Sequence, residues 1–213
     1  MSMPEPQPEQ PRRRRRWFQY SLRTLLLVMF LTSIGLSWFA VRLQQARRQR
    51  EGVEEIKKLG GVVCYDYEAH QSGKPPGPGW LRKLLGDDFF AEVDLVQVSN
   101  DAAMEHLNGL PRLSAVVCDT RVTDVGLEQL KGLTQLRELY LEYLDVTDIG
   151  LEHLKALTQL QALYLSGTRV TDAGLDHLKA LTQLRKLTVE DTRVTDQGVK
   201  KLQQNLPNCK ITR

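Results

Sequence analysis

Hydrophobic positions recur along the second half of the chain with a period of 24 residues. The motif Val-Thr-Asp-x-Gly-Leu begins at Val122, Val146 and Val170, and a fourth copy, Val-Thr-Asp-Gln-Gly-Val, begins at Val194. A Leu-x-x-Leu-x-Leu segment lies between the motifs, starting at Leu136, Leu160 and, with a final Val, Leu184. Self-similarity at a fixed period of about 20–50 residues predicts a solenoid in which each repeat is one structural unit.

Each unit divides into two expected elements. The alternating Leu-x-Leu segment predicts a short strand, with Leu139 and Leu141 directed inward. The Thr-Asp pair predicts a helix N-cap, and leucines at three-residue spacing, as in Leu127, Leu130 and Leu133, place one apolar stripe on the helix. We expect the motif glycines at positions 126, 150, 174 and 198 to allow close packing against the next unit.

This pattern resembles the leucine-rich repeat family, over about half of the chain. Similar motifs occur in bacterial leucine-rich-repeat proteins and in substrate-receptor subunits of ubiquitin ligases, but no F-box-like segment precedes the repeats here. The resemblance implies an α/β leucine-rich-repeat solenoid over residues 99–213, with short parallel strands on a concave face and helices on a convex face. Many family members have Asn where this chain has Thr120, Thr168 and Thr192, and Leu144 departs from that pattern.

A second apolar stretch, continuous and not periodic, lies near the amino terminus. Residues 24–41 are 18 residues without a charge, and as a helix they would rise about 27 Å, close to the ~30 Å hydrocarbon core of a bilayer. Trp17, Tyr20, Trp38 and Phe39 lie near its ends, as in an aromatic belt. We predict a single transmembrane helix over residues 17–42, an uncleaved signal anchor. The alternatives are a cleaved signal peptide, which bulky residues 37–42 fit poorly, and a buried helix of a soluble protein.

Charge divides the chain unevenly. Residues 1–50 hold ten Arg and two Glu, a net +8, whereas the remaining 19 Lys plus Arg and 24 Asp plus Glu give −5. The Pro-, Gln- and Glu-rich start predicts a disordered basic arm over residues 1–16. Six Arg before the apolar stretch against four after it favour a cytoplasmic amino terminus and an extracytoplasmic repeat domain. We expect the arm to contact anionic lipid headgroups, not nucleic acid, through Arg12, Arg13, Arg14, Arg15 and Arg16.

The segment between anchor and repeats is expected to form a juxtamembrane helix and an amino-terminal cap, residues 43–98, because an open solenoid end exposes core. Val53, Ile56 and Leu59 indicate a helix that Gly60-Gly61 would end. Residues 62–65 and 93–98 suit strands, residues 71–79 a loop, and residues 80–85 a short amphipathic helical turn.

The concave face is the predicted interaction surface, since such surfaces are continuous and rigid. Adjacent strands lie about 4.8 Å apart, so Tyr140 and Tyr164 should be neighbours. Two exposed tyrosines among carboxylates predict a hot spot for a basic or peptide-like partner, unless they merely favour strand structure. The candidate partner-binding residues are Val117, Asp119, Glu138, Tyr140, Glu142, Tyr164, Ser166, Lys186, Thr188 and Glu190.

The sequence offers no convergent chemistry. We find no Ser, His and Asp set, metal-ligand cluster or glycine-rich phosphate loop, and therefore predict no catalytic residue, metal or cofactor. His106, His153 and His177 share one repeat position and are expected on the polar outer face. Cys118 occupies a position otherwise held by Leu or Val, so we expect it to be a small buried hydrophobe. The favoured function is a non-enzymatic, membrane-anchored protein-interaction module, and the alternative is a structural envelope scaffold without a specific soluble ligand.

Overall fold

The computed structural model describes residues 22–69, 76–110 and 112–213. The basic arm, its arginines, Trp17, Tyr20 and most of the 71–79 loop therefore lie outside the described residues. The chain forms two compact units, residues 1–40 and 41–213, and each is described by itself. Helix α1 (Leu22–Lys58) begins in the first unit and ends in the second.

The described part of the first unit is an apolar helix. Every side chain from Thr24 to Ala40 is exposed. The hydroxyls of Thr32 and Ser33 donate to the carbonyls of Met29 and Phe30 at 2.9 and 2.8 Å, so these polar groups are satisfied within the helix, as apolar surroundings require. The mean hydropathy reaches 2.0 over an 18-residue window, enough by length and composition to cross a membrane. A signal sequence meets the same criteria.

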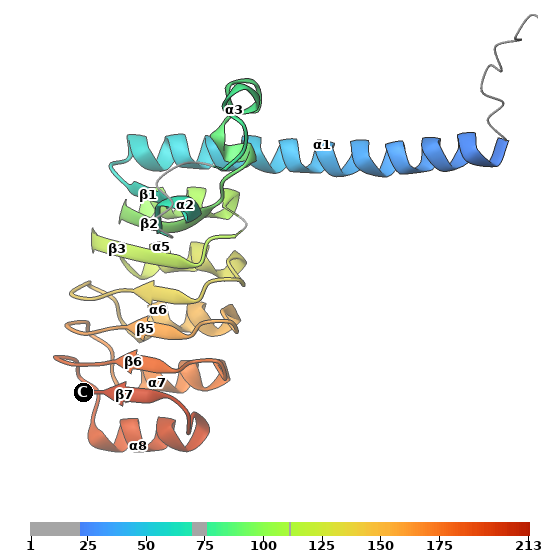
Figure 1. The fold of residues 1–213 in the computed structure, drawn as a ribbon. Helices are drawn as coiled ribbons and strands as arrows, with labels where there is room; N and C mark the ends of the chain where they lie inside the picture. The colour runs from blue at the N-terminus through green and yellow to red at the C-terminus, as the bar shows by residue number, and fades with distance from the viewer. Residues whose placement is uncertain (1–21, 70–75, 111) are drawn as a thin grey trace, which may run out of the picture. The chain divides into compact units, whose positions relative to one another are not determined.

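The second unit contains a seven-stranded sheet whose strands lie side by side in chain order. β1 pairs antiparallel with β2, and every later pairing is parallel. Short helices cover one face, so the unit has the leucine-rich-repeat-like architecture expected from the sequence (Figure 1). The strands are β1 (Val62–Tyr65), β2 (Val93–Asn100), β3 (Ala115–Arg121), β4 (Glu138–Tyr140), β5 (Ala162–Tyr164), β6 (Lys186–Thr188) and β7 (Lys210–Thr212).

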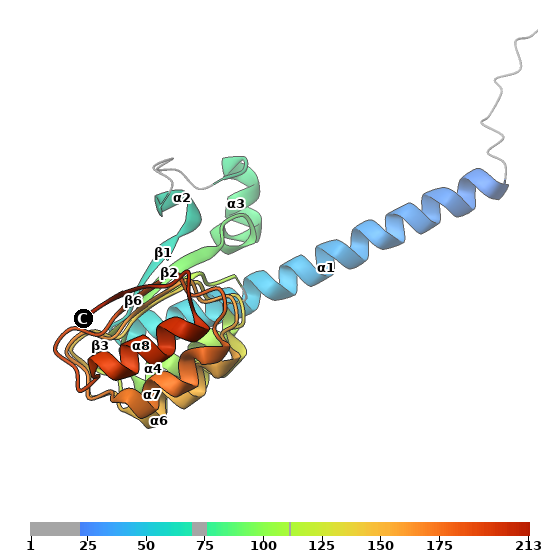
Figure 2. The same ribbon diagram turned by 90° about the horizontal axis from the view of Figure 1, so that it is seen from below.

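Each coil of the solenoid, one strand and the helical segment that follows it, carries a short α-helix, mostly continued by a 3-10 turn. Figure 2 shows these helices stacked on the face opposite the strands, and α2 and α3 on the strand side. The segments between β1 and β2 are α2 (Asp66–Ala69), α3 (Gly79–Leu85) and η1 (Asp87–Phe89). The coils carry α4 (Asp101–Met104), η2 (Glu105–Gly109), α5 (Asp124–Leu127), η3 (Glu128–Gly132), α6 (Asp148–His153), η4 (Leu154–Ala156), α7 (Asp172–His177), η5 (Leu178–Ala180) and α8 (Asp196–Asn205).

One apolar core runs through all the coils. Leu139, Leu163 and Leu187 are inaccessible to solvent in adjacent strands, and the helix leucines at 130, 154 and 178 close the core from the other side. Cys118 is buried in the same cluster, which confirms its prediction as a core residue.

The end of α1 caps the first coil. Val53 and Ile56 are buried against the core, and Gly60 ends the helix with a φ of +85°, a conformation that glycine adopts without strain. The predicted helix and its stop are thus confirmed. β2, which the sequence analysis placed in the cap, is hydrogen-bonded in parallel register with β3 and so already belongs to the repeating sheet.

A set of hydrogen bonds that we call the Asp–Thr ladder joins the coils. The predicted Thr N-caps are confirmed, because each Thr hydroxyl accepts from a backbone N–H of its own helix. The following Asp, at the first helical position, reaches the next coil. Asp148 accepts from the backbone N–H and from the hydroxyl of Thr171 at 2.8 and 2.6 Å. The same pair of bonds links Asp101 to Thr123, Asp124 to Thr147, and Asp172 to Thr195.

The motif glycine makes room for the ladder. A Cβ added at Gly174 would overlap the Asp148 carboxylate, and the other motif glycines face the equivalent Asp. The close contact is therefore with the preceding coil, not with the next coil as the sequence analysis expected.

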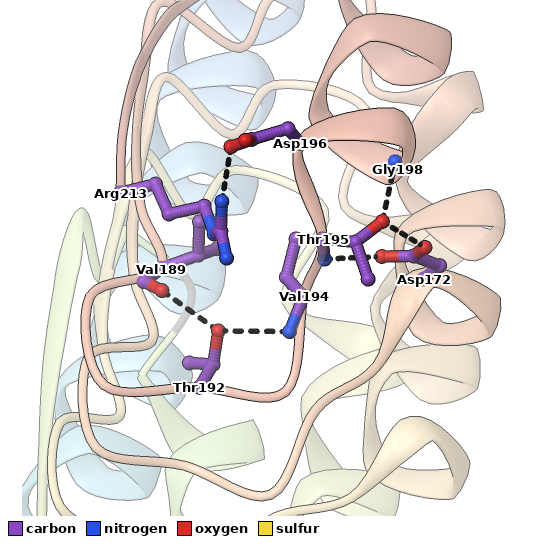
Figure 3. Close-up of polar contacts among 8 residues, drawn as sticks. All are labelled: Asp172, Val189, Thr192, Val194, Thr195, Asp196, Gly198 and Arg213. Atoms are coloured by element: carbon purple, nitrogen blue, oxygen red, sulfur yellow. Dashed lines mark hydrogen bonds and ion pairs between the residues drawn. The ribbon is translucent and has the colours of Figure 1, made fainter.

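The ladder ends at the last described coil. Figure 3 shows Thr195 bonded to both the Asp172 carboxylate and the Gly198 N–H, whereas Asp196 forms an ion pair with Arg213. An exposed surface pair of this kind contributes little to stability.

Two of the three threonines at the family's Asn position bond the turn backbone. Thr168 and Thr192 donate to the carbonyls of Leu165 and Val189 at 2.6 and 2.7 Å. Thr192 also accepts from the Val194 N–H (Figure 3). At the departing position Leu144 is only 3% exposed and joins the core instead.

Asp148→Ala should lower the free energy of unfolding by about 1–3 kcal/mol, because it leaves the Thr171 N–H and hydroxyl without their acceptors. The matched change is Asp196→Ala, at the same repeat position, where only the exposed pair with Arg213 is lost and about 0–1 kcal/mol is expected. Thermal unfolding followed by circular dichroism measures both. Equal losses at the two positions would contradict a role for the ladder.

Candidate functional site

The outward side chains of the strands form rows across the strand face. In the central row the register pairs Gln97 with Val117, Val117 with Tyr140, Tyr140 with Tyr164, and Tyr164 with Thr188. The parallel pairing without shifts from β3 to β6 follows from equal spacing of the Leu-x-Leu segments. The expected proximity of the two tyrosines is therefore present.

The two tyrosine rings are stacked. Their centroids are 4.2 Å apart and their planes differ by 6°. The Tyr140 hydroxyl donates to Glu138 Oε2 at 2.7 Å. Burial, followed by this hydrogen bond, raises the pKa of Tyr140, so its phenol remains a donor at neutral pH. Both rings are partly buried, and the stack fixes their rotamers.

A cation completes the cluster. Lys186 Nζ lies 4.7 Å from the centroid of the Tyr164 ring, within cation–π range. Lys186 is exposed, so its ammonium also faces solvent. We call Glu138, Tyr140, Tyr164 and Lys186 the tyrosine cluster.

The other predicted face residues differ in accessibility. Asp119, Glu142 and Glu190 are exposed, and Val117 and Thr188 are half-buried. Ser166 is only 5% exposed, and its hydroxyl donates to Thr188 Oγ1 at 3.2 Å. It therefore supports the sheet from below the surface, with little area left for a partner.

Tyr143 is a surface residue that the sequence analysis missed. It is 69% exposed, and its φ of +59° is unusual for a non-glycine residue. The equivalent positions one and two repeats later, Gly167 and Asp191, also have positive φ, at +72° and +53°. Gly167 was the one available signal, because glycine commonly fills such a position. The Tyr143 ring lies against Gly167, next to the exposed Glu142.

A polar cavity of about 510 Å³ lies where the cap meets the first strands. Glu92 holds Arg42 and Arg112 at 2.6 and 2.7 Å. The buried amide of Gln49 donates to the Ala91 carbonyl at 3.0 Å and to Asp88 at 3.3 Å. These contacts between α1 and the start of β2 give the cavity a structural purpose, since they join the cap to the sheet.

Within the described ranges the structure contains no cluster of three or more His, Cys, Asp or Glu side chains suited to a metal ion. Of the three free cysteines, Cys118 and Cys209 are buried, and burial raises the pKa of Cys209 to about 11. Buried thiols with a raised pKa are poor nucleophiles.

No family model and no curated protein matches the chain. Similar solved structures include an internalin from Listeria monocytogenes, 23% identical, over 51% of this chain and 30% of the internalin chain, with a TM-score of 0.44. Internalin C2 from the same organism is 30% identical over 50% of this chain and 44% of its own, with a TM-score of 0.43. The leucine-rich-repeat ectodomain of the receptor kinase SOBIR1 from Arabidopsis thaliana is 13% identical over 78% of this chain and 91% of its own, with a TM-score of 0.45. This chain spans less than half the length of either internalin. The description as a leucine-rich-repeat-like solenoid therefore rests on its own strand order, helix placement and 24-residue register.

Proposed function

We propose that this chain is a non-enzymatic, membrane-anchored interaction module that presents its strand face to a protein partner. The apolar part of α1 anchors it, the basic arm contacts anionic lipid, and the repeat unit lies on the extracytoplasmic side. The observation that supports partner binding best is the stacked Tyr140–Tyr164 pair on an otherwise small-residue and charged face.

The tyrosine cluster has the properties of a binding hot spot. Two aromatic rings offer a large contact area, and the stack and the Glu138 hydrogen bond hold them before a partner arrives. Little side-chain entropy remains to be lost on binding, which favours affinity. Exposed Asp119, Glu142 and Glu190 surround the cluster and suit a partner that carries Lys or Arg.

Tyr140→Ala combined with Tyr164→Ala should reduce capture of the partner at least about tenfold, the effect of losing hot-spot side chains. The experiment places a photo-crosslinking residue at the neighbouring Thr188 in the full chain, within its native membrane, and quantifies the crosslinked product. The matched control is Val125→Ala combined with Ile149→Ala, which removes two exposed apolar side chains from the opposite, helical face.

Three outcomes separate the candidates. Loss of the product in the tyrosine variant alone supports the binding face. A product that survives in both variants contradicts it and favours the structural scaffold. Protease accessibility and alkaline extraction of the same membranes test the anchor and its orientation, because an anchored chain stays in the pellet.

A further inference from the structure

Helix α3 has an inverted distribution of side chains. Surface helices usually turn apolar residues inward and charges outward. Here Trp80 and Leu84 are 70% and 74% exposed, whereas the Arg82 side chain is 28% exposed and turns toward Asp87 at 3.5 Å. The Arg82 Nε atom is buried without a hydrogen-bond partner among the described residues. None of the α3 residues, all of which the structure describes, is buried.

The exposed side chains form one patch. Trp80 and Leu84 are four residues apart, so they lie on the same side of the helix, and the exposed Lys83 is adjacent. Contiguous apolar side chains at a surface mark an interaction site. A Trp, a Leu and a Lys on one short helix are the composition that favours the boundary between lipid headgroups and acyl chains.

The contacts of the second unit place this patch near the end of the apolar stretch. The segment after α3 is bonded to α1 by Arg42 with Glu92 at 2.6 Å and by Gln49 with Asp88 at 3.3 Å. Arg42 is the residue at which the uncharged stretch ends. Residues 42–49 of a helix rise only about 12 Å, so α3 is attached within about two turns of that end.

Charge favours the same occupant. The exposed side chains of α1 beyond the apolar stretch include Arg47, Arg48 and Arg50, and α3 adds Lys83. A cluster of cations directly after an apolar helix is attracted to anionic lipid by about 1 kcal/mol for each residue near the surface.

We propose that α3 is a second membrane contact, in which Trp80 and Leu84 enter the headgroup boundary of an anionic bilayer while Lys83 and the α1 arginines bind lipid phosphates. The inference rests on the proposed anchoring by α1. It adds that the repeat unit is held against the lipid surface, and does not merely hang from a tether.

Single-tryptophan variants of the full chain test this contact. Trp17→Phe with Trp38→Phe leaves Trp80 as the reporter, and Trp17→Phe with Trp80→Phe leaves Trp38. Each is reconstituted in vesicles of mixed zwitterionic and anionic phospholipid with brominated acyl chains. Bromines near the headgroup should quench Trp80 at least about twofold more than bromines near the chain ends, since the patch enters only the boundary.

The matched control carries Val125→Trp with all three native tryptophans replaced by Phe. Position 125 is 72% exposed, similar to Trp80, but lies on α5 on the helical face, and it should remain unquenched. Leu84→Asp in the Trp80 chain should reduce its quenching toward that of position 125.

Quenching of Trp38 without quenching of Trp80 overturns the α3 contact and leaves the anchor intact. Absence of quenching at both overturns the anchor together with this inference. A blue-shifted Trp80 emission that no brominated lipid quenches indicates that protein covers the patch, and also overturns the proposal.

Discussion

Gly150→Ala is expected to lower the free energy of unfolding by about 2–3 kcal/mol, the upper part of the range for overpacking a filled site. A Cβ at this position would overlap Asp124 Oδ1 and lie 2.8 Å from Leu127 Cδ1. The Asp124 carboxylate cannot withdraw freely, because it accepts both bonds from Thr147. Thermal unfolding of the full chain in detergent, followed by circular dichroism, measures the loss.

Gly79→Ala is the matched control, since the nearest atom to its added Cβ is Arg82 Nη2 at 3.8 Å. Its stability should be unchanged. The double variant Asp124→Ala with Gly150→Ala tests the cause, because removing the carboxylate opens the space that the methyl needs. The two losses should then fail to add by about 0.5–3 kcal/mol. Strict additivity would indicate that the cost comes from backbone conformation and not from the ladder.

Leu163→Ala should cost about 3–4 kcal/mol, within the range found for Leu→Ala at closed core sites. Leu163 is at the centre of β5, inaccessible to solvent, and its register neighbours Leu139 and Leu187 are equally buried. Each of these neighbours is fixed by its own strand, so the cavity cannot collapse easily. Loss of Tm relative to the parent is the measurement.

The same substitution at Leu84 provides the comparison. Leu84 is 74% exposed on α3, so Leu84→Ala should leave the unfolding temperature in detergent nearly unchanged. Similar losses at positions 84 and 163 would mean that α3 packs in the solubilised protein, which would also argue against its proposed contact with lipid.

The repeat period predicts the elements well because one physical rule is applied several times. Alternation at Leu139 and Leu141 predicts a strand, and its recurrence 24 residues later predicts the parallel neighbour. The proximity of Tyr140 and Tyr164 follows from the same register. The irregular first unit is also explained. Ala103 can replace the glycine because the cap that precedes it brings no Asp into that position, and Asn100 supplies the N-cap by accepting from the Ala103 N–H at 2.9 Å.

Contacts between coils could not be predicted in the same way. A Thr-Asp pair predicts a cap for its own helix, but the bond from Asp148 to Thr171 depends on how two coils are superposed. The left-handed backbone at Tyr143 is imposed by the turn geometry and not by its residue type. For α3 the sequence predicts an amphipathic turn. Which side of the turn is covered depends on the rest of the fold, and the exposure of Trp80 could therefore be found only from the structure.

The Asp–Thr ladder gives the solenoid a direction. Every rung joins an acceptor in one coil to donors in the following coil, and the described rungs all run the same way. Ribosomes make the amino-terminal part first, and folding can begin before synthesis ends. The carboxylate of each rung is therefore always translated before the threonine that it receives. A nascent chain can complete its rungs one at a time as it emerges, without waiting for its carboxyl terminus.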